Sequence, residues 1–367
     1  MITYLSIYIY LSIISLSEVK LSYQAKKTYF ILLFIFMLLF ISGRHYVGGD
    51  YVAYLNLFNE YGLKNNTNLA GLIYIISFVH KLGLNYLFFN FICALIFLTG
   101  IFKFLKISDE RLFFFILLIP TMIYVVGMGY TRQSVSIGFL CFAIYYWIEN
   151  MSVRKYIFFI IAVFLHISSV IFIFLLFYKV NEKIKLTKLF ILITLTTSFL
   201  FLFYYLYFNS LDNLSSAMGL EYKIVKNSSL KYLKFLSHIV PCIVFLIFIK
   251  KFSKDKKIFP LYFFSLVTTI TVIIAMIIFK QLVAQSSYID VIADRVLLPL
   301  ILIETLIFVR LCSLIDLEYK FLFKSLILFY FGLTLFIWLE FADNSHAWKP
   351  YRSIFLESYA DGFNDKP

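Results

Sequence analysis

Residues 26–44 read KKTYFILLFIFMLLFISGR, with an uncharged apolar run at 28–42 between two lysines and an arginine. A helix that crosses a membrane needs about 20 predominantly apolar residues, and roughly 17 can suffice. We therefore predict a membrane-spanning helix here. Comparable runs recur at roughly 85–105, 112–129, 133–149, 189–208, 237–250, 258–279, 295–311 and 323–341, and the opening 2–16 is shorter but rich in Ile, Leu and Tyr.

The composition excludes a soluble globular protein. Of 367 residues, 62% are hydrophobic and 14% are charged, whereas soluble domains carry about a quarter charged residues. One core cannot hide this apolar excess, because a globule of this size still needs a wetted polar surface. We predict an all-α polytopic membrane protein, a single transmembrane domain over 1–367, with about 10–12 transmembrane helices and one or two re-entrant or interfacial segments.

The formal net charge of +13 does not indicate nucleic-acid binding. Lysines cluster in short runs between apolar stretches, as in Lys250–Lys251 and Lys256–Lys257. Short basic loops are typical of the cytoplasmic side of membrane proteins, because cationic loops resist translocation. A nucleic-acid surface would need a basic face interleaved with polar and aromatic groups, so we expect no nucleic-acid partner.

The sequence gives no sign of a disulfide, metal or cofactor site. The cysteines lie in or beside apolar segments without CxxC spacing, and we interpret them as small packing residues. No HExxH, DxD or spaced Cys/His set is present. The apolar start lacks a basic n-region and a small-residue cleavage site, so we expect it to be a retained span. The four cysteines are Cys93, Cys141, Cys242 and Cys312.

The basic loops predict an orientation in the membrane. Three lysines place 17–27 inside, so the loop 44–68 lies outside, and the basic segment 103–111 is internal again. One crossing fits between these two loops, and 85–105 is the better candidate. Residues 69–83 are then interfacial or re-entrant.

Residues 156–178 raise a similar question. The flanking 151–155 and 179–188 are both basic and therefore predicted internal, so 156–178 should enter and return, with a break near His166. A single crossing is the rival interpretation. The polar segments on the outside are then roughly 43–68, 209–236, 280–294 and the C-terminal tail 342–367.

The first candidate site is the outside segment 44–54, RHYVGGDYVAY. Its two glycines permit a positive φ or a close approach of the backbone to a ligand. Arg44 is suited to a phosphate, and Asp50 to a proton acceptor or a sugar hydroxyl. Equally, Asp50 is suited to capping a helix, and the aromatic residues that follow, Tyr54 included, to a belt at the membrane interface.

Two further arginines lie where membrane proteins disfavour them. Arg132 follows Thr131 in a short outside turn, and Arg295 follows Asp294; in each case the first residue is expected to cap the next helix. Both arginines are then on the outside and at the positive end of a helix dipole. Snorkelling to lipid headgroups is one explanation. A bound diphosphate is the one we favour, because guanidinium forks and helix N-termini both bind phosphate oxygens.

Two ionisable residues lie within apolar stretches. His166 interrupts FLHISSVIF, and Glu304 lies near the centre of its predicted span. Ionisable groups in spans tend to face cavities, although a lone histidine is also a common structural hydrogen-bonding group. Glu304 is expected to be protonated or paired.

Five motifs in order resemble the EpsG-like family, part of the wider Wzy group of O-antigen and exopolysaccharide polymerases. They are RHYVGGDYVAY, TRQSVSIGFL, FLHISSVIF, DRVLLPL and the tail WKPYRSIF, starting at 44, 131, 164, 294 and 348. The resemblance implies a bacterial inner-membrane enzyme that joins undecaprenyl-diphosphate-linked oligosaccharide repeat units and needs no cofactor. Membrane lipid and a chain-length regulator are the further partners expected.

The resemblance also implies roles for the candidate residues. Arg44, Arg132 and Arg295 would hold the diphosphate, and Asp50 or His166 would take the proton of the acceptor hydroxyl. Possible glycan contacts are Tyr54, Gln133, Glu304, Tyr351 and Arg352.

A flippase or transporter of the same lipid-linked glycans is the rival function. That function predicts inverted repeats and mid-membrane charges. The sequence shows no such internal symmetry, although Glu304 and His166 keep this alternative open.

Overall fold

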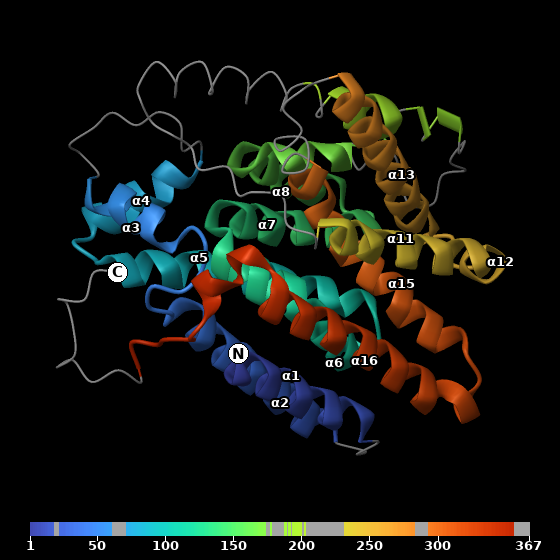
Figure 1. Ribbon diagram of the computed structural model, residues 1–367, viewed down its shortest axis with the longest axis horizontal. Helices are drawn as coiled ribbons and strands as arrows, with labels where there is room; N and C mark the ends of the chain where they lie inside the picture. The colour runs from blue at the N-terminus through green and yellow to red at the C-terminus, as the bar shows by residue number, and fades with distance from the viewer. Residues whose placement is uncertain are drawn as a thin grey trace. The chain divides into compact units, whose positions relative to one another are not determined.

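In the computed structural model, residues 1–17, 22–60, 71–173, 231–282 and 293–355 are described, with scattered positions between 177 and 202. The regular elements in these ranges are all helices, and the described residues form no strand (Figure 1). Five helices are long and apolar enough to cross a membrane: Tyr23–Ser42, Tyr86–Ile107, Phe259–Ile278, Ala293–Leu314 and Leu317–Phe341. The prediction of an all-α polytopic membrane protein is confirmed.

Each of these five helices matches a predicted span. Shorter apolar helices cover further predicted spans at Ile2–Leu16, Arg111–Gly127 and Phe235–Ile247. The predicted span 189–208 lies largely outside the described residues. The total of about 10–12 crossings therefore stays a prediction.

The chain divides into two compact units. Unit 1 comprises Met1–Phe142, Ile160–His166 and Lys324–Pro367, and unit 2 comprises Ala143–Phe159 and Ile167–Phe323. Within unit 1 the helices begin with α1 (Ile2–Leu16), α2 (Tyr23–Ser42), α3 (Tyr51–Asn59), α4 (Leu72–Lys81), α5 (Tyr86–Phe104) and α6 (Arg111–Leu118). Unit 2 includes α11 (Lys231–Ile247), α12 (Ile249–Phe252), α13 (Phe259–Leu282) and α15 (Ile301–Leu314). Three helices run from one unit into the other: α7 (Thr131–Ile148), α8 (Ser152–Leu165) and α16 (Leu317–Phe341).

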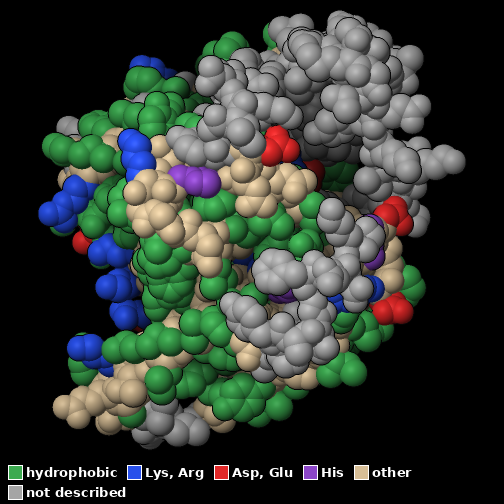
Figure 2. Space-filling view, turned by 90° about the vertical axis from the view of Figure 1, so that its left-hand side faces the viewer, with side chains coloured by type: hydrophobic (Ala, Val, Ile, Leu, Met, Phe, Trp, Pro, Cys, Tyr) green, Lys and Arg blue, Asp and Glu red, His purple; other side chains and the backbone are tan. Residues whose placement is uncertain are grey.

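The surface of the described residues is widely apolar. Figure 2 shows hydrophobic side chains over much of one face, with Lys and Arg side chains gathered along one margin. On α2, for example, Ile31, Leu32 and Phe36 are exposed. Exposed large apolar side chains on a long helix are expected where the solvent is lipid.

The two ambiguous segments contain broken or short helices. Helix α4 has 10 residues, so it rises only about 15 Å and is too short to cross. This agrees with the prediction that 69–83 is interfacial or re-entrant. Helix α8 ends at Leu165, and a 3₁₀ segment, η4 (Ile167–Ile173), follows. The predicted break near His166 is confirmed, while the path of 156–178 through the membrane stays a prediction.

The predicted span 112–129 consists of an α-helical part followed by a π-helical part. After α6, nine residues from Ile119 to Gly127 form a π-helical segment, η3, with Pro120 near its start. Proline has no N–H for the usual bond to the carbonyl four residues earlier, and π-helical segments occur where that ladder is interrupted. The change places Tyr124 beside the C-terminal tail, as described below.

Helices α5 and α7 cross at two glycines. A Cβ on Gly100 would lie 2.1 Å from the carbonyl oxygen of Gly138. Small residues allow membrane helices to approach this closely. The crossing brings the beginnings of α5 and α7 toward the end of α2, where Arg44 lies.

Candidate functional site

Arg44 follows the end of α2 and is buried, with 2% of its surface exposed. Its guanidinium donates to neutral acceptors: Nη1 to the carbonyl of Ile41 at 2.7 Å, and Nη2 to Asn90 Oδ1 at 3.3 Å and Thr131 Oγ1 at 3.5 Å. The Tyr51 ring lies 6.0 Å from the guanidinium carbon. Within the described ranges, no carboxylate pairs with Arg44.

Two buried donors at this site lack a partner among the described residues. They are Nε of Arg44 and Nδ2 of Asn90, the second of which has only the Tyr86 hydroxyl near it. Buried charges in proteins are normally paired, because an uncompensated charge is costly to remove from water. The N-terminus of α7 begins at Thr131 and contributes further N–H groups and a positive dipole end. The arrangement has the chemistry of an anion site.

The loop after Arg44 is held against the turn before α7. Gly48 has φ of +106°, and a Cβ there would lie 2.0 Å from the carbonyl oxygen of Met128. The Asp50 N–H donates to the carbonyl of Gly129 at 3.1 Å. The prediction of a glycine with positive φ is confirmed, although the close neighbour is the protein's own backbone.

Asp50 precedes α3 at the N-cap position, but its side chain makes no capping hydrogen bond. The interpretation of Asp50 as the N-cap is therefore confirmed for its position, without a capping bond from its side chain. The aromatic stripe that follows is a packed core: Tyr51, Tyr54 and Phe58 are buried together with Phe89 of α5. The interpretation as an interfacial belt is wrong for these three rings, because they face other side chains of unit 1.

The C-terminal tail packs around the same site. Ser353 forms an isolated antiparallel bridge with Arg44, and the His45 N–H donates to the carbonyl of Arg352 at 3.1 Å. The Tyr351 ring stacks on Phe40 at 4.3 Å between centroids. Its hydroxyl donates to the carbonyl of Phe40 at 2.8 Å, and burial raises the pKa of Tyr351. Tyr351 is thus an anchor of the tail, while the Arg352 side chain is exposed.

The other candidates of unit 1 lie at the start of α7 and the end of α8. Arg132 is half-buried in the first turn of α7, as predicted, and Gln133 is buried beside it. Thr131 is the first helical residue, so the predicted helix begins slightly earlier, and its hydroxyl faces Arg44. His166 is buried, with 8% of its surface exposed.

Arg295 belongs to unit 2 and is half-buried. It lies in helical residues that already include Ala293, so Asp294 is inside the helix and the prediction that Asp294 caps it is wrong. Within unit 1, by contrast, Arg44 and the Thr131–Gln133 segment are brought into direct contact.

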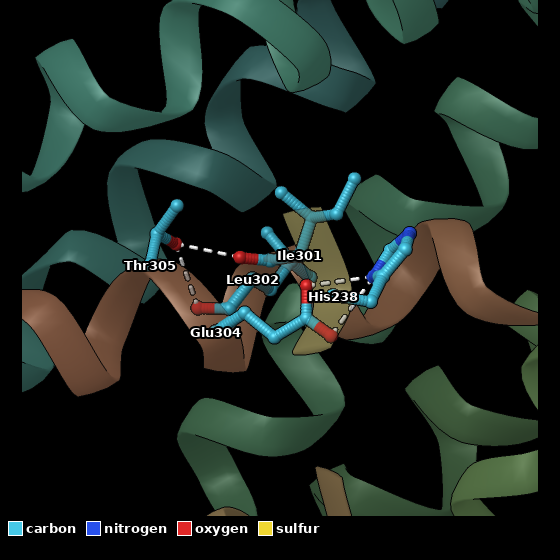
Figure 3. A network of polar contacts seen from close by, with 5 residues as sticks. All are labelled: His238, Ile301, Leu302, Glu304 and Thr305. Atoms are coloured by element: carbon cyan, nitrogen blue, oxygen red, sulfur yellow. Dashed lines mark hydrogen bonds and ion pairs between the residues drawn. The ribbon is translucent and has the colours of Figure 1, made fainter. Parts of the chain in front are cut away.

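Glu304 is paired, in agreement with one of the two states predicted for it. Nδ1 of His238 lies 2.9 and 2.8 Å from the two carboxylate oxygens, and both residues are buried. Figure 3 shows the two side chains pointing toward one another from α11 and α15. A carboxylate held on both oxygens in this way is unsuited to a glycan contact, and that role for Glu304 stays a prediction without support from the geometry.

The sequence matches the EpsG family over residues 27–353, nearly the whole chain. The chain belongs to the EpsG family. EpsG is a Wzy-like polymerase family. No curated protein and no solved structure matches the chain. The matched range includes Arg44, the loop after it, the start of α7 and the tail to Ser353.

Asn90 and His238 of this EpsG-family chain were not predicted from the sequence, although one contacts Arg44 and the other Glu304. Each is a polar residue in an apolar stretch, FFNFICALI at 88–96 and LSHIVPCIVF at 236–245. A lone polar residue within a span is the signal that could have found them. It identified His166 and Glu304 and should have been applied to both stretches.

Proposed function

We propose that this EpsG-family protein is a polysaccharide polymerase of the bacterial inner membrane. It joins undecaprenyl-diphosphate-linked oligosaccharide repeat units at the extracytoplasmic face and releases undecaprenyl diphosphate. The observation that carries the proposal is the buried Arg44, which has unsatisfied donor capacity and no carboxylate partner in the described structure. An extracytoplasmic chain-length regulator protein is the further partner that we expect.

In this proposal Arg44 binds the diphosphate of the donor. Its Nε is a donor that no described residue accepts, the Asn90 amide is a second donor beside it, and the first N–H groups of α7 supply more. Arg132 lies in the same first turn of α7 and is the second candidate ligand. Arg295 stays a candidate on the sequence alone, because it belongs to the other unit.

The reaction itself is a displacement at the anomeric carbon of the donor glycan. The acceptor hydroxyl oxygen forms the new glycosidic bond, the bond from the anomeric carbon to the diphosphate oxygen breaks, and its electron pair leaves with the diphosphate. The charge that develops there is stabilised by preorganised donors such as the Arg44 fork. The hydroxyl proton passes to a base, for which Asp50 and His166 are the sequence-based candidates.

The test is to delete the gene and examine the banding of surface glycan after complementation with variants. We expect Arg44→Ala and Arg132→Ala to abolish long chains while single-repeat glycan is retained. Lys188→Ala is the control, because this exposed lysine is predicted to be cytoplasmic. Arg44→Lys should restore chains poorly, because lysine keeps the charge but lacks the fork. Immunoblots of the membrane fraction verify that each variant is present.

Normal banding with Arg44→Ala and Arg132→Ala would contradict the diphosphate role. Loss of the single-repeat glycan as well in the deletion strain would favour the alternative, a flippase for lipid-linked oligosaccharides. A polymerase leaves delivery of the repeat unit intact, so the two functions give different bands.

A further inference from the structure

Helix α13 of unit 2 carries a stripe of buried hydroxyl groups. Tyr262, Ser265 and Thr269 recur at spacings of three and four residues, so they share one face of the helix, and Thr268 is adjacent. All four residues are at most 1% exposed. Within the described ranges the hydroxyls of Tyr262, Ser265 and Thr268 have no hydrogen-bond partner, and the Thr269 hydroxyl meets only the thiol of Cys242.

These hydroxyls differ from others in the same unit. Serine and threonine in helices usually bond back to a carbonyl in the preceding turn. Thr271 does so to Val267 at 2.8 Å, and Thr305 does so to Ile301 at 2.7 Å. Ser265, Thr268 and Thr269 make no such bond, although they lie in the same helix as Thr271. Buried polar groups of this kind are ordinarily satisfied by internal water.

The stripe leads toward the His238–Glu304 pair. Helices α11, α13 and α15 pack against one another in pairs (Figure 1). The Thr269 hydroxyl faces the Cys242 thiol, a weak partner, and Cys242 is also within electrostatic range of Glu304. Cys242 follows His238 by one helical turn on α11. Thr269 therefore connects α13 with the neighbourhood of the pair.

The other end of the stripe reaches a second polar pair. Tyr262 is within electrostatic range of Asp255 and Arg310, whose side chains approach to 3.6 Å. Arg310 Nε is another buried atom that the described residues leave without a partner. The hydroxyl groups of α13 thus lie between two polar pairs. Asp255 and Arg310 are at one end, and His238 and Glu304 are at the other.

The pair itself is arranged to exchange a proton. Nδ1 of His238 contacts both carboxylate oxygens of Glu304 at 2.9 and 2.8 Å, so a proton lies between an imidazole and a carboxylate that are both buried. Among the described titratable groups, Cys242 interacts electrostatically with Glu304, whereas Tyr262 interacts with Asp255 and Arg310.

We propose that α11, α13 and α15 enclose a hydrated polar track, in which internal water joins the α13 hydroxyls and the His238–Glu304 pair binds an exchangeable proton. The ligand class is water and a proton. This site is independent of the diphosphate site of unit 1 and of the polymerase proposal.

Hydration is tested by cysteine accessibility in the purified full-length protein, in a background with the four native cysteines replaced by alanine. Ser265→Cys and Thr269→Cys are compared with Val267→Cys, a buried position on the opposite face of α13 with an apolar native side chain. The probe is 2-aminoethyl methanethiosulfonate. We expect the first two variants to react about tenfold or more faster than the third, because the charged reagent reaches thiols only through water. Equal rates at all three positions would overturn the hydrated track.

Proton exchange is tested by infrared spectroscopy of the intact protein titrated between about pH 5 and pH 9, the range in which histidine pairs titrate. We expect a carboxylate band that changes intensity with pH and is absent in Glu304→Gln. His238→Gln should shift its midpoint. A Glu304 band that is unchanged over this range would overturn the exchangeable proton, even if the track is hydrated. Neither measurement uses polymerase activity, so a failure here is distinct from a failure of the proposed function.

Discussion

The indole N–H of Trp348 donates to the main-chain carbonyl of Tyr124 at 2.8 Å, which ties the C-terminal tail to the π-helical segment η3. Tyr4 of α1 closes the arrangement by donating from its hydroxyl to the carbonyl of Trp348 at 2.8 Å. The buried indole lies over Gly129, in the turn that also receives Asp50. The tail therefore supports the loop that follows Arg44.

Gly129→Ala should loosen this contact. A Cβ at Gly129 would lie 2.0 Å from Cζ2 of Trp348, and the large buried ring cannot yield without moving the tail. We expect a loss of about 1–3 kcal/mol in stability and a melting temperature lower by about 5 °C. Thermal unfolding in detergent measures the change.

The matched control is Gly49→Ala. Its Cβ would approach the same indole at 3.4 Å, an ordinary van der Waals distance, so the melting temperature should stay close to that of the wild type. Equal effects of the two substitutions would contradict the view that Trp348 is fixed over Gly129.

Asn90→Asp tests whether the charge of Arg44 is reserved for a ligand. Asn90 Oδ1 is 3.3 Å from Arg44 Nη2, so an aspartate would pair with the guanidinium and neutralise it. We expect stability to be unchanged or higher, because a buried charge gains a partner. Polymerisation should fall by about 10²-fold, since one preorganised contact to the leaving group is lost.

The control is Asn85→Asp on the same helix. Asn85 caps α5 through its side-chain oxygen, and aspartate serves that role equally well. Long glycan chains made normally by the Asn90→Asp variant would show that Arg44 acts as a structural residue only.

The sequence predicted the kind of fold well and the geometry of the site in part. Long apolar runs indicate segments that lie in lipid, and short basic loops indicate the cytoplasmic side, so the five long helices could be predicted. The motifs that contain Arg44 and Thr131 were also foreseen to share one membrane face. That Asn90 completes their contact was not predictable, because a packing partner 46 residues away leaves no periodic signal.

The same limit explains the misplaced caps and the aromatic stripe. A capping residue and the first residue of a helix look alike in sequence, and helix ends are uncertain by one or two residues. An aromatic residue suits an interfacial belt and a core equally well. For Tyr54 the sequence left open an interfacial belt and a glycan contact. Its partners on α5 are distant in sequence, so only the tertiary packing shows that its ring is part of a core.

The path of residues 156–178 can be tested by labelling at position 183. Lys183 lies outside the described residues, but α8 stops at Leu165 just before the predicted break. If the segment enters and returns, Lys183→Cys in a cysteine-less background should be protected from an impermeant maleimide added outside intact cells. It should react after permeabilisation. Labelling from outside would require a full crossing.

The His238–Glu304 pair either only holds α11 to α15 or also takes part in activity, and substitutions of both residues distinguish these roles. The two side chains are 3% and 5% exposed, so removing one partner leaves the other buried and uncompensated. His238→Phe alone should cost about 3–5 kcal/mol of stability, because it strands the carboxylate. Glu304→Met alone should cost less, since it removes the carboxylate and leaves a side chain that histidine chemistry allows in a neutral form. The double variant should recover most of the stability, because an apolar pair of similar volume avoids desolvation altogether.

Denaturant unfolding of the four proteins gives the coupling energy, and additive effects would contradict direct pairing. The double variant also tests whether the pair is needed for activity. If the pair only holds α11 to α15, the refilled variant should complement the deletion strain and make long chains. If the proton bound by His238 takes part in activity, the variant should be as stable as the wild type and yet inactive, a combination that a purely structural role does not produce.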